Sequence, residues 1–252
     1  MIERNIFQTW YTKELDPSVQ RVIDEMKDLN PTYQYFLYDD AEMDAFVDTY
    51  FPGVVADCYH RLTIMAAKVD LWRCLVLYQY GGVYVDIDST IIRSLDLVIQ
   101  DRDEAIVSPS VHSPPGIYIH WILIFRKGHP LLKRTIDLIV DNIQTNRYPN
   151  DVMKMTGPNI YSEAVAEAIR LSNDPVPPYS SLCHYKTDIT FAFAYNDEPT
   201  SVRILGFQMY LVFKYNTSYC LYRNKKHWYQ EQAERPLLSG PAPKIDISDK
   251  TT

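Results

Sequence analysis

Apolar and polar residues follow two different periods along the first ninety positions of the chain. Short apolar runs at residues 6–10 and 33–38 are typical of buried strands. Between them, Asp16 followed by Pro17 predicts a helix start, and apolar side chains then recur at helical spacing up to Leu29. The chain is therefore expected to open with a strand, a helix and a second strand.

The next segments continue this alternation. Residues 39–46 predict a helix that opens with an acidic capping box, and residues 62–80 carry the clearest helical pattern. Two glycines at positions 81 and 82 stop that helix, and an apolar strand at residues 83–87 follows at once. This order predicts an α/β fold with a mostly parallel central sheet and flanking helices on both faces.

The order of elements beyond Asp88 is less regular. We expect strands at residues 105–107, 117–125, 189–194 and 207–213, and helices at residues 130–144 and 158–171. Residues 236–252 are rich in proline and polar side chains without a period, which predicts a poorly ordered tail. No repeat or flexible linker divides the rest, so we expect one domain over residues 1–235.

Composition and charge exclude several classes of protein. Of the 252 residues, 46% are hydrophobic and 23% are charged, which is typical of a folded globule and excludes extensive disorder. The formal net charge of −7 argues against nucleic acid as a partner, since phosphate backbones bind positively charged surfaces. An anionic ligand would therefore need a metal ion or a few well-placed cations.

The cysteines and the lengths of the apolar runs indicate the cellular compartment in which the protein is expected. Cys58, Cys74, Cys183 and Cys220 lie far apart and form no CxxC motif, which favours reduced thiols over disulfides or a zinc site. No apolar run reaches the about 20 residues that cross a bilayer, and the first residues lack the apolar core of a signal peptide. We expect a soluble, cytoplasmic protein without a transmembrane segment.

Candidate chemistry concentrates in one helix and the strand after it. Asp70 and Arg73 lie on one face of the predicted helix. Tyr84, Asp86 and Asp88 point to one side of the strand, with both carboxylates at its carboxyl end, the edge where open α/β sheets bind ligands. Because adjacent carboxylates repel each other, we expect Mg²⁺ or Mn²⁺ beside them, together with a phosphorylated ligand.

The same residues also permit a plain structural interpretation. In it, Asp70 and Arg73 form a surface ion pair, the two glycines end a helix, and the strand carboxylates keep a loop soluble. We disfavour this interpretation because a pair of acids seldom ends an apolar strand without a partner.

Three ordered segments resemble a known enzyme family. They are Phe7-Gln8-Thr9-Trp10, the pair Asp70 and Arg73, and the run Tyr-Gly-Gly-Val-Tyr-x-Asp-x-Asp over residues 80–88. Together they are similar to the family 32-like GT-A glycosyltransferases of the sugar-binding DxD group, which includes fungal initiating mannosyltransferases and bacterial capsular polysaccharide enzymes. The resemblance covers residues 6–96 and implies a GT-A, Rossmann-like nucleotide-sugar-binding fold.

The resemblance also implies a site. Its donor-binding residues would be Gln8, Thr9, Trp10, Asp70, Arg73, Tyr84, Asp86 and Gly157, its catalytic residues Asp70, Arg73, Asp86 and Asp88, and its metal ligands Asp88, Asp86 and His227. Trp10 is expected at the nucleotide base, and Asp70 and Arg73 at the donor sugar or its phosphates. Asp86 is expected at ribose or sugar hydroxyls, and Asp88 at the metal. Val69 stands where the family usually has a small hydroxyl residue, which leaves the donor sugar open.

Two later segments carry softer signals. Thr156-Gly157-Pro158 is similar to a family turn that approaches the donor through backbone amides, or it is an ordinary helix start. His227-Trp228 is similar to a late segment that closes over the diphosphate and adds a metal ligand, or His227 is an unremarkable histidine. His120, His129 and His184 carry weaker claims, and His129 is placed to cap a helix.

Two other classes of function stay open from the sequence. A phosphatase of the haloacid dehalogenase type also has a strand that ends in DxDx(T/V), and would use Asp86 as nucleophile and Asp88 as general acid. Its motif normally lies near the N-terminus and precedes a second acidic pair, which we do not find beyond Asp103. A non-catalytic nucleotide-sugar-binding module would keep the fold without turnover.

We therefore predict a metal-dependent glycosyltransferase. It would move a hexose or related sugar from a UDP- or GDP-linked donor to a hydroxyl of a glycan or glycolipid, and the resemblance implies retention of the anomeric configuration. Residues 1–110 would form the nucleotide-sugar-binding half and residues 111–235 the acceptor half. No convincing nucleophile is visible, so a covalent intermediate and direct assistance by the departing phosphate are both open.

Overall fold

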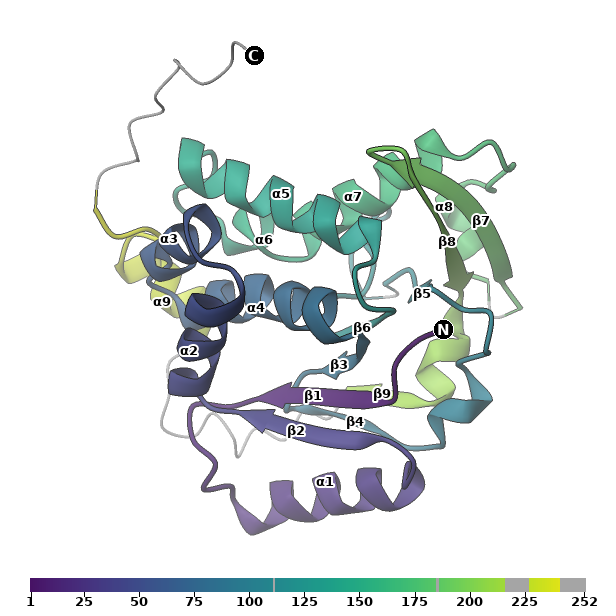
Figure 1. Ribbon diagram of the computed structural model, residues 1–252, viewed down its shortest axis with the longest axis horizontal. Coiled ribbons are helices and arrows are strands. Elements are labelled where there is room, and N and C mark those ends of the chain that lie inside the picture. The colour runs from purple at the N-terminus through teal and green to yellow at the C-terminus, as the bar shows by residue number, and fades with distance from the viewer. Residues whose placement is uncertain (111, 185, 216–226, 241–252) are drawn as a thin grey trace.

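Seven strands form one central sheet in the computed structural model, which describes residues 1–110, 112–184, 186–215 and 227–240 (Figure 1). Across the sheet the order is β2 (Gln34–Tyr38), β1 (Asn5–Thr9), β3 (Gly82–Val85), β6 (Ile122–Phe125), β5 (Ala105–Val107), β8 (Glu198–Leu205) and β7 (Asp188–Tyr195). β1, β2, β3, β5 and β8 point the same way, and β6 and β7 run antiparallel to their neighbours. The predicted α/β fold with a mostly parallel sheet is confirmed.

A second, two-stranded sheet and the helices complete the described elements. The small sheet pairs β4 (Ser89–Ile91) with β9 (Phe213–Tyr215). The α-helices are α1 (Pro17–Leu29), α2 (Asp40–Tyr50), α3 (Val54–Arg61), α4 (Met65–Tyr80), α5 (Pro130–Thr145), α6 (Val152–Met155), α7 (Pro158–Leu171), α8 (Tyr179–Leu182) and α9 (Trp228–Glu234). The short 3-10 helices are η1 (Leu95–Leu97) and η2 (Phe207–Leu211).

Helices cover both faces of the central sheet, as predicted. Figure 1 shows α1 on one side of β1 and β2, and α4, α5 and α7 on the other side. Ile6 and Val83 pack with Ile23 of α1 in one core, whereas Phe7 and Tyr84 belong to the core under α4, α5 and α7. Successive strand residues thus alternate between two cores, because their side chains point to opposite faces of the sheet.

The turn between α4 and β3 requires its two glycines. Gly81 and Gly82 have φ angles of +66° and +119°, a region that side chains disfavour. A Cβ on Gly81 would lie 2.5 Å from the backbone nitrogen of Lys127, and a Cβ on Gly82 would lie 2.6 Å from the backbone oxygen of Asn5. This close approach places β3 directly after α4 and against β1.

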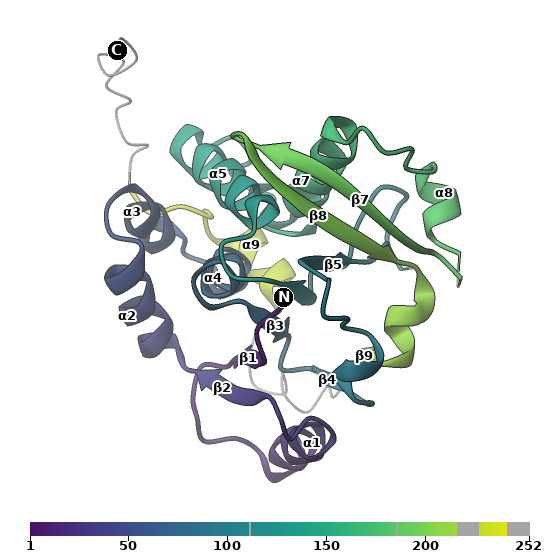
Figure 2. The same cartoon turned by 45° about the vertical axis from the view of Figure 1, so that its right-hand side comes forward.

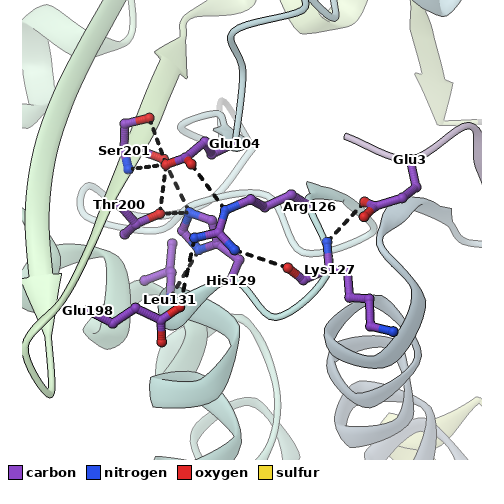
Figure 3. Close-up of polar contacts among 9 residues, drawn as sticks. All are labelled: Glu3, Glu104, Arg126, Lys127, His129, Leu131, Glu198, Thr200 and Ser201. Carbon is purple, nitrogen blue, oxygen red and sulfur yellow. Dashed lines mark hydrogen bonds and ion pairs between the residues drawn. The ribbon is translucent and has the colours of Figure 1, made fainter. Parts of the chain in front are cut away.

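A polar network connects β5, β6, β8 and the start of α5 (Figure 3). It lies at the ends of the strands near the start of β3, away from the carboxyl end of β3. Glu104 accepts hydrogen bonds from the Thr200 hydroxyl (3.0 Å) and from Arg126 Nε (3.2 Å). His129 Nδ1 accepts from the amide of Leu131, so this histidine caps α5 as predicted, and its Nε2 lies 2.9 Å from the Thr200 hydroxyl. The network connects the long β7–β8 hairpin, which forms one side of the sheet (Figure 2), to the neighbouring strands and to α5.

Several elements of the second half differ from the prediction. The β7–β8 hairpin turns at Asn196 and Asp197, whose φ angles of +51° and +61° match a type I′ turn, and β8 was not predicted. The strand predicted at residues 207–213 is wrong, because this segment forms η2 and only the first residue of β9. β6 covers only the last part of the predicted strand at residues 117–125.

Two differences in the first half are smaller. Residues 54–61 form α3, which was not predicted, and α4 begins at Met65 rather than at residue 62. β3 ends at Val85, so Asp86 and Asp88 lie in the turn after the strand and not within it.

Residues 236–240 pack against the domain, unlike the loose tail predicted for residues 236–252. Leu237 and Leu238 are buried, Leu238 forms a bridge with Leu62, and the amide of Thr63 donates to the Leu237 carbonyl at 2.9 Å. The remaining residues 241–252 of that predicted tail lie outside the described residues.

Two further observations concern the cysteines and the membrane. Cys58, Cys74 and Cys183 are free thiols, and Cys220 lies outside the described residues. Within the described ranges, none of the helices combines the length and the apolar character that a membrane crossing requires.

Candidate active site

A cleft of about 570 Å³ opens at the edge of the sheet where β1 and β3 end. Its walls come from the segment after β1, one face of α4, the turn after β3, the loop before β6, and the segments around α6, α7 and α9. The predicted site residues that line it are Thr9, Trp10, Asp70, Arg73, Tyr84, Asp86, Asp88 and His227. Segments far apart in the sequence thus meet at the carboxyl edge of the sheet, where this class of fold binds ligands.

Arg73 lies at the centre of the polar part of this cleft. Its Nη2 is 3.1 Å from Asp86 Oδ1 and 3.4 Å from Asp70 Oδ1. Its Nη1 donates to the backbone oxygen of His120 at 2.6 Å, and its guanidinium carbon lies 4.8 Å from the centre of the Tyr84 ring. The Tyr84 hydroxyl donates a 2.7 Å hydrogen bond to Asp86 Oδ1. Arg73, which is only 6% exposed, is therefore a buried cation held by two carboxylates.

Burial and neighbouring charges act in opposite directions on this cluster. Burial raises the pKa of Asp86, Arg73 and the Tyr84 hydroxyl oppose that shift, and the net direction is upward. Burial by itself would lower the pKa of Arg73, but the charge of Asp86, together with Tyr84 and Asp70, raises it above its ordinary value. Arg73 consequently stays protonated, and its charge is what makes ionised Asp86 tolerable in this place.

Asp70 is held by groups from three different parts of the chain. Its Oδ1 faces Arg73 and also lies 3.4 Å from Nδ1 of His120. Its Oδ2 accepts a 3.1 Å hydrogen bond from the hydroxyl of Thr156. Both carboxylate oxygens therefore have a partner, and the side chain is 10% exposed.

Gln8 does not line the cleft, but it contacts the backbone of Asp86, which does. Its Nε2 donates to the backbone oxygen of Asp86 at 3.2 Å, and its Oε1 accepts from the Tyr35 hydroxyl at 2.9 Å. Gln8 is 1% exposed, so the described contacts give it a role in fixing the turn after β3.

Thr9 and Trp10 follow β1 at the same edge. The Thr9 hydroxyl donates to the Tyr38 carbonyl at 2.9 Å, which ties β1 to β2. Trp10 is half-buried, lines the cleft, and lies with its ring 5.0 Å from that of Tyr11. An aromatic ring at this position offers a flat apolar surface to a planar ligand, and its place at a nucleotide base stays a prediction.

Asp88 and His227 face the cleft from the turn after β3 and from the start of α9. Asp88 is 8% exposed, and Ser89 at the start of β4 donates to its Oδ1 at 3.4 Å. Nδ1 of His227 accepts from the amide of Tyr229 and so caps α9. No group of three histidine, cysteine or acidic side chains suited to a metal ion occurs in the described part of the chain. A cation here would need ligands from a bound substrate as well.

Gly157 does not line the cleft, although the neighbouring Pro158 does. Its amide donates to the carbonyl of Val152 at 3.0 Å, and a Cβ on it would lie 2.9 Å from Cα of Met153. The contacts of Thr156-Gly157-Pro158 thus reach Asp70 through the Thr156 hydroxyl, and the Gly157 amide is already engaged within the turn.

Sequence reasoning gave His120 only a weak claim and did not connect His120 or Thr156 with Asp70. His120 precedes β6, which pairs antiparallel with β3, so its position beside Asp70 depends on a pairing between distant segments. Thr156 was noted only as the start of a turn. No local period or spacing in the sequence marks either side chain as a partner of Asp70.

The comparisons with known proteins show what the segment that carries this site is similar to. Residues 16–105 match the family model of the glycosyltransferase sugar-binding region containing a DXD motif, and this range includes Asp70, Arg73, Asp86 and Asp88. The resemblance predicted from the sequence is therefore confirmed. Over these residues the chain is similar to the DXD sugar-binding region of glycosyltransferases.

Two of the matching relatives are fungal proteins named as mannosyltransferases. The chain is 23% identical to the initiation-specific alpha-1,6-mannosyltransferase of Candida albicans over 65% of this chain and 52% of that protein. It is 32% identical to inositol phosphoceramide mannosyltransferase 3 of Schizosaccharomyces pombe over 62% of this chain and 43% of that one. The chain spans about half the length of the curated relatives it matches.

A solved structure agrees with the fold. The PaToxG glycosyltransferase superposes with a TM-score of 0.56 at 21% identity, over 67% of this chain and 70% of that chain. The predicted GT-A fold is thereby confirmed.

Proposed function

We propose that this protein transfers a hexose from a UDP- or GDP-linked donor to a hydroxyl of a glycan or glycolipid. The observation that carries the proposal is the buried cluster in which Arg73 joins Asp70 and Asp86 beside Asp88, within the segment matched to the DXD sugar-binding region. Because the relatives are named as mannosyltransferases, mannose is the first donor sugar that we propose.

The cluster supplies what a sugar donor needs. Carboxylate oxygens of Asp70 and Asp86 can accept hydrogen bonds from sugar or ribose hydroxyls, and such bonds to charged groups are the stronger kind. Arg73 holds both carboxylates in place and adds positive charge where a diphosphate leaving group becomes more negative. Trp10 offers its ring to the base at the end of β1.

A divalent metal, Mg²⁺ or Mn²⁺, fits the donor set of this edge. Asp88 and Asp86 provide hard oxygen ligands, His227 lines the same cleft, and phosphate oxygens of the donor would complete the shell. When bound, such a metal would neutralise charge on the departing diphosphate. The residues of the chain would hold it and orient the donor against it.

We propose retention with the departing phosphate taking the proton of the acceptor hydroxyl. Asp70 contacts Arg73, His120 and Thr156, and Asp86 contacts Arg73 and Tyr84. A carboxylate engaged in this way is a poor nucleophile, since its charge is already shared with donors. The configuration of the product, read by NMR, tests retention, and a glycosyl adduct on Asp70 or Asp86 found by mass spectrometry would contradict the role of the phosphate.

The two rival functions make different demands. A phosphatase would need Asp86 as an attacking nucleophile, but Asp86 Oδ1 is engaged by Arg73 and Tyr84, and the family match favours the glycosyltransferase. A binding module would keep the site without turnover.

A donor screen separates these functions. The chain is incubated with Mn²⁺ and a panel of UDP- and GDP-linked sugars, and with a phosphate monoester, and slow release of sugar or phosphate is measured. The proposal predicts hydrolysis of one donor class that is lost in excess chelator and in Asp88→Asn, while Asp96→Asn, an exposed acid remote from the cleft, serves as the matched control. Monoester hydrolysis, or donor binding without any turnover, would contradict it.

A further inference from the structure

His120 lies between the two charged residues of α4. Its Nδ1 is 3.4 Å from Asp70 Oδ1 and 3.4 Å from Arg73 Nη1, and its backbone oxygen accepts from the same Arg73 nitrogen at 2.6 Å. The ring is 4% exposed, and its centre lies 5.3 Å from that of Tyr161 on α7. The imidazole is therefore fixed on one side by packing and presents Nδ1 to both charged groups.

The pairing of β3 with β6 explains how His120 reaches this place. The amide of Asp86 donates to the carbonyl of Trp121 at 2.9 Å, which continues the β3–β6 pairing by one step. The residue before Trp121 is thereby carried next to the turn that follows β3. His120 Nε2, in contrast, is buried without a partner among the described residues, so only Nδ1 is used.

Thr156 restrains the other side of Asp70. Its side chain is fully buried, and its hydroxyl lies 3.1 Å from Asp70 Oδ2 and 3.4 Å from the carbonyl of Val152. His120 and Thr156 both come from the second half of the chain, whereas Asp70 and Arg73 come from α4. The orientation of the Asp70 carboxylate thus depends on contacts between the two halves.

We propose that His120 and Thr156 are positioning residues that fix the Asp70 carboxylate, and through it Arg73, in the orientation used for the donor sugar. This inference rests on the proposed function. Burial and the charge of Arg73 lower the pKa of His120, so the ring is neutral and adds no second positive charge to the cluster. Neither residue touches the sugar in this account. Their effect is expected in turnover and not in binding of the nucleoside diphosphate alone.

The chain offers a matched control for the Thr156 hydroxyl. Thr135 on α5 is also fully buried, and its hydroxyl donates to the carbonyl four residues earlier at 2.8 Å, whereas the Thr156 hydroxyl donates to Asp70 and lies 3.4 Å from the corresponding carbonyl of Val152. Thr135→Val therefore measures the general effect of removing a buried helical hydroxyl. Any additional effect of Thr156→Val belongs to the contact with Asp70.

The experiment compares kcat for donor hydrolysis, KM, thermal midpoint and affinity for bare UDP or GDP. Thr156→Val should lower kcat about tenfold relative to Thr135→Val, with unchanged affinity for the nucleoside diphosphate, as for one lost hydrogen bond to a charged group. Thr156→Ser should restore most of kcat. His120→Phe, which keeps the ring but not Nδ1, should lose kcat, and His120→Asn, which places a polar atom near Nδ1, should recover part of it.

Two results would overturn the inference. One is a Thr156→Val variant whose kcat equals that of Thr135→Val. The other is a loss of nucleoside diphosphate affinity as large as the loss of kcat. A wild-type chain that turns over no nucleotide sugar would instead overturn the proposed function, and this inference with it, so the two failures are distinguishable.

Discussion

The substitution Arg73→Met removes the buried cation that balances the negative charges of Asp70 and Asp86. In the wild-type protein, Arg73 is 3.1 Å from Asp86 and 3.4 Å from Asp70, and all three side chains are largely buried. Methionine preserves most of the volume and the apolar contact with the Tyr84 ring, but it carries no charge. The variant would leave Asp70 and Asp86 facing each other without compensation.

The expected loss of stability follows from the exposure of these groups. Removing one partner of a buried ion pair typically costs about 3–5 kcal/mol. The side chain of Asp86 is 25% exposed, which allows some hydration and places the expectation near the lower end, at about 3 kcal/mol. Arg4 and Asp96 form a comparable pair with exposures of 51% and 54%, for which Arg4→Met should cost about 1 kcal/mol or less.

The effect should also depend on pH with a defined sign. Burial already raises the pKa of Asp86, and loss of Arg73 removes a charge that opposes this rise, so the pKa of Asp86 would move further upward. A carboxyl group with a raised pKa in the folded state destabilises the fold at high pH and ceases to do so once it is protonated. The difference between Arg73→Met and the wild type should therefore shrink as the pH falls.

Urea unfolding followed by tryptophan fluorescence measures these free energies. The series comprises the wild type, Arg73→Met, Arg4→Met, and Arg73→Met combined with Asp86→Asn, at pH 8 and pH 5.5. The double variant should recover part of the lost stability, because it removes a carboxylate together with its cation. Equal losses for Arg73→Met and Arg4→Met, or no recovery in the double variant, would refute the buried charge cluster.

Two further predictions concern Trp10, which is expected at the nucleotide base, and His129, which caps α5. Trp10→Ala should raise KM for the donor much more than it lowers the melting temperature, because the half-buried ring lines the cleft; a collapse of stability with unchanged donor affinity would show a core tryptophan instead. Burial lowers the pKa of His129 to about 3. In the unfolded chain the same imidazole binds a proton below about pH 6.5. The free energy of unfolding should therefore fall as the pH falls from about 6.5 toward 3. His129→Asn, which can still cap α5 in the network of Figure 3, should show a shallower decline of the melting temperature over this range, and an identical slope would contradict the assignment.

The first half of the fold could be predicted because its signals are local. Asp16 accepts from the amide of Ser18, and Asp39 and Glu42 form a capping box, so both helix starts follow from neighbouring residues. The two glycines after α4 mark a turn that the backbone angles require. The same local pattern carried the resemblance that predicted Asp70, Arg73, Asp86 and Asp88.

The second half could be predicted less well because pairing between distant segments decides it. β4 and β9 are three residues each and form only through their contact, and β8 is defined by its pairing with β7 and β5. The contacts of His120 and Thr156 with Asp70 join positions up to 86 residues apart in the chain. Periodicity within a window cannot reveal such contacts.

The most direct test of the central claim is calorimetric binding of the intact nucleotide sugar and of the bare nucleoside diphosphate to Asp70→Ala. The account predicts that this variant binds the intact donor about tenfold to hundredfold more weakly than the wild type, as expected for lost hydrogen bonds to a carboxylate. Binding of the bare nucleoside diphosphate should stay nearly unchanged, since Asp86, Asp88 and Trp10 remain. Equal weakening of both ligands would contradict the assignment of Asp70 to the donor sugar and with it this account of the site.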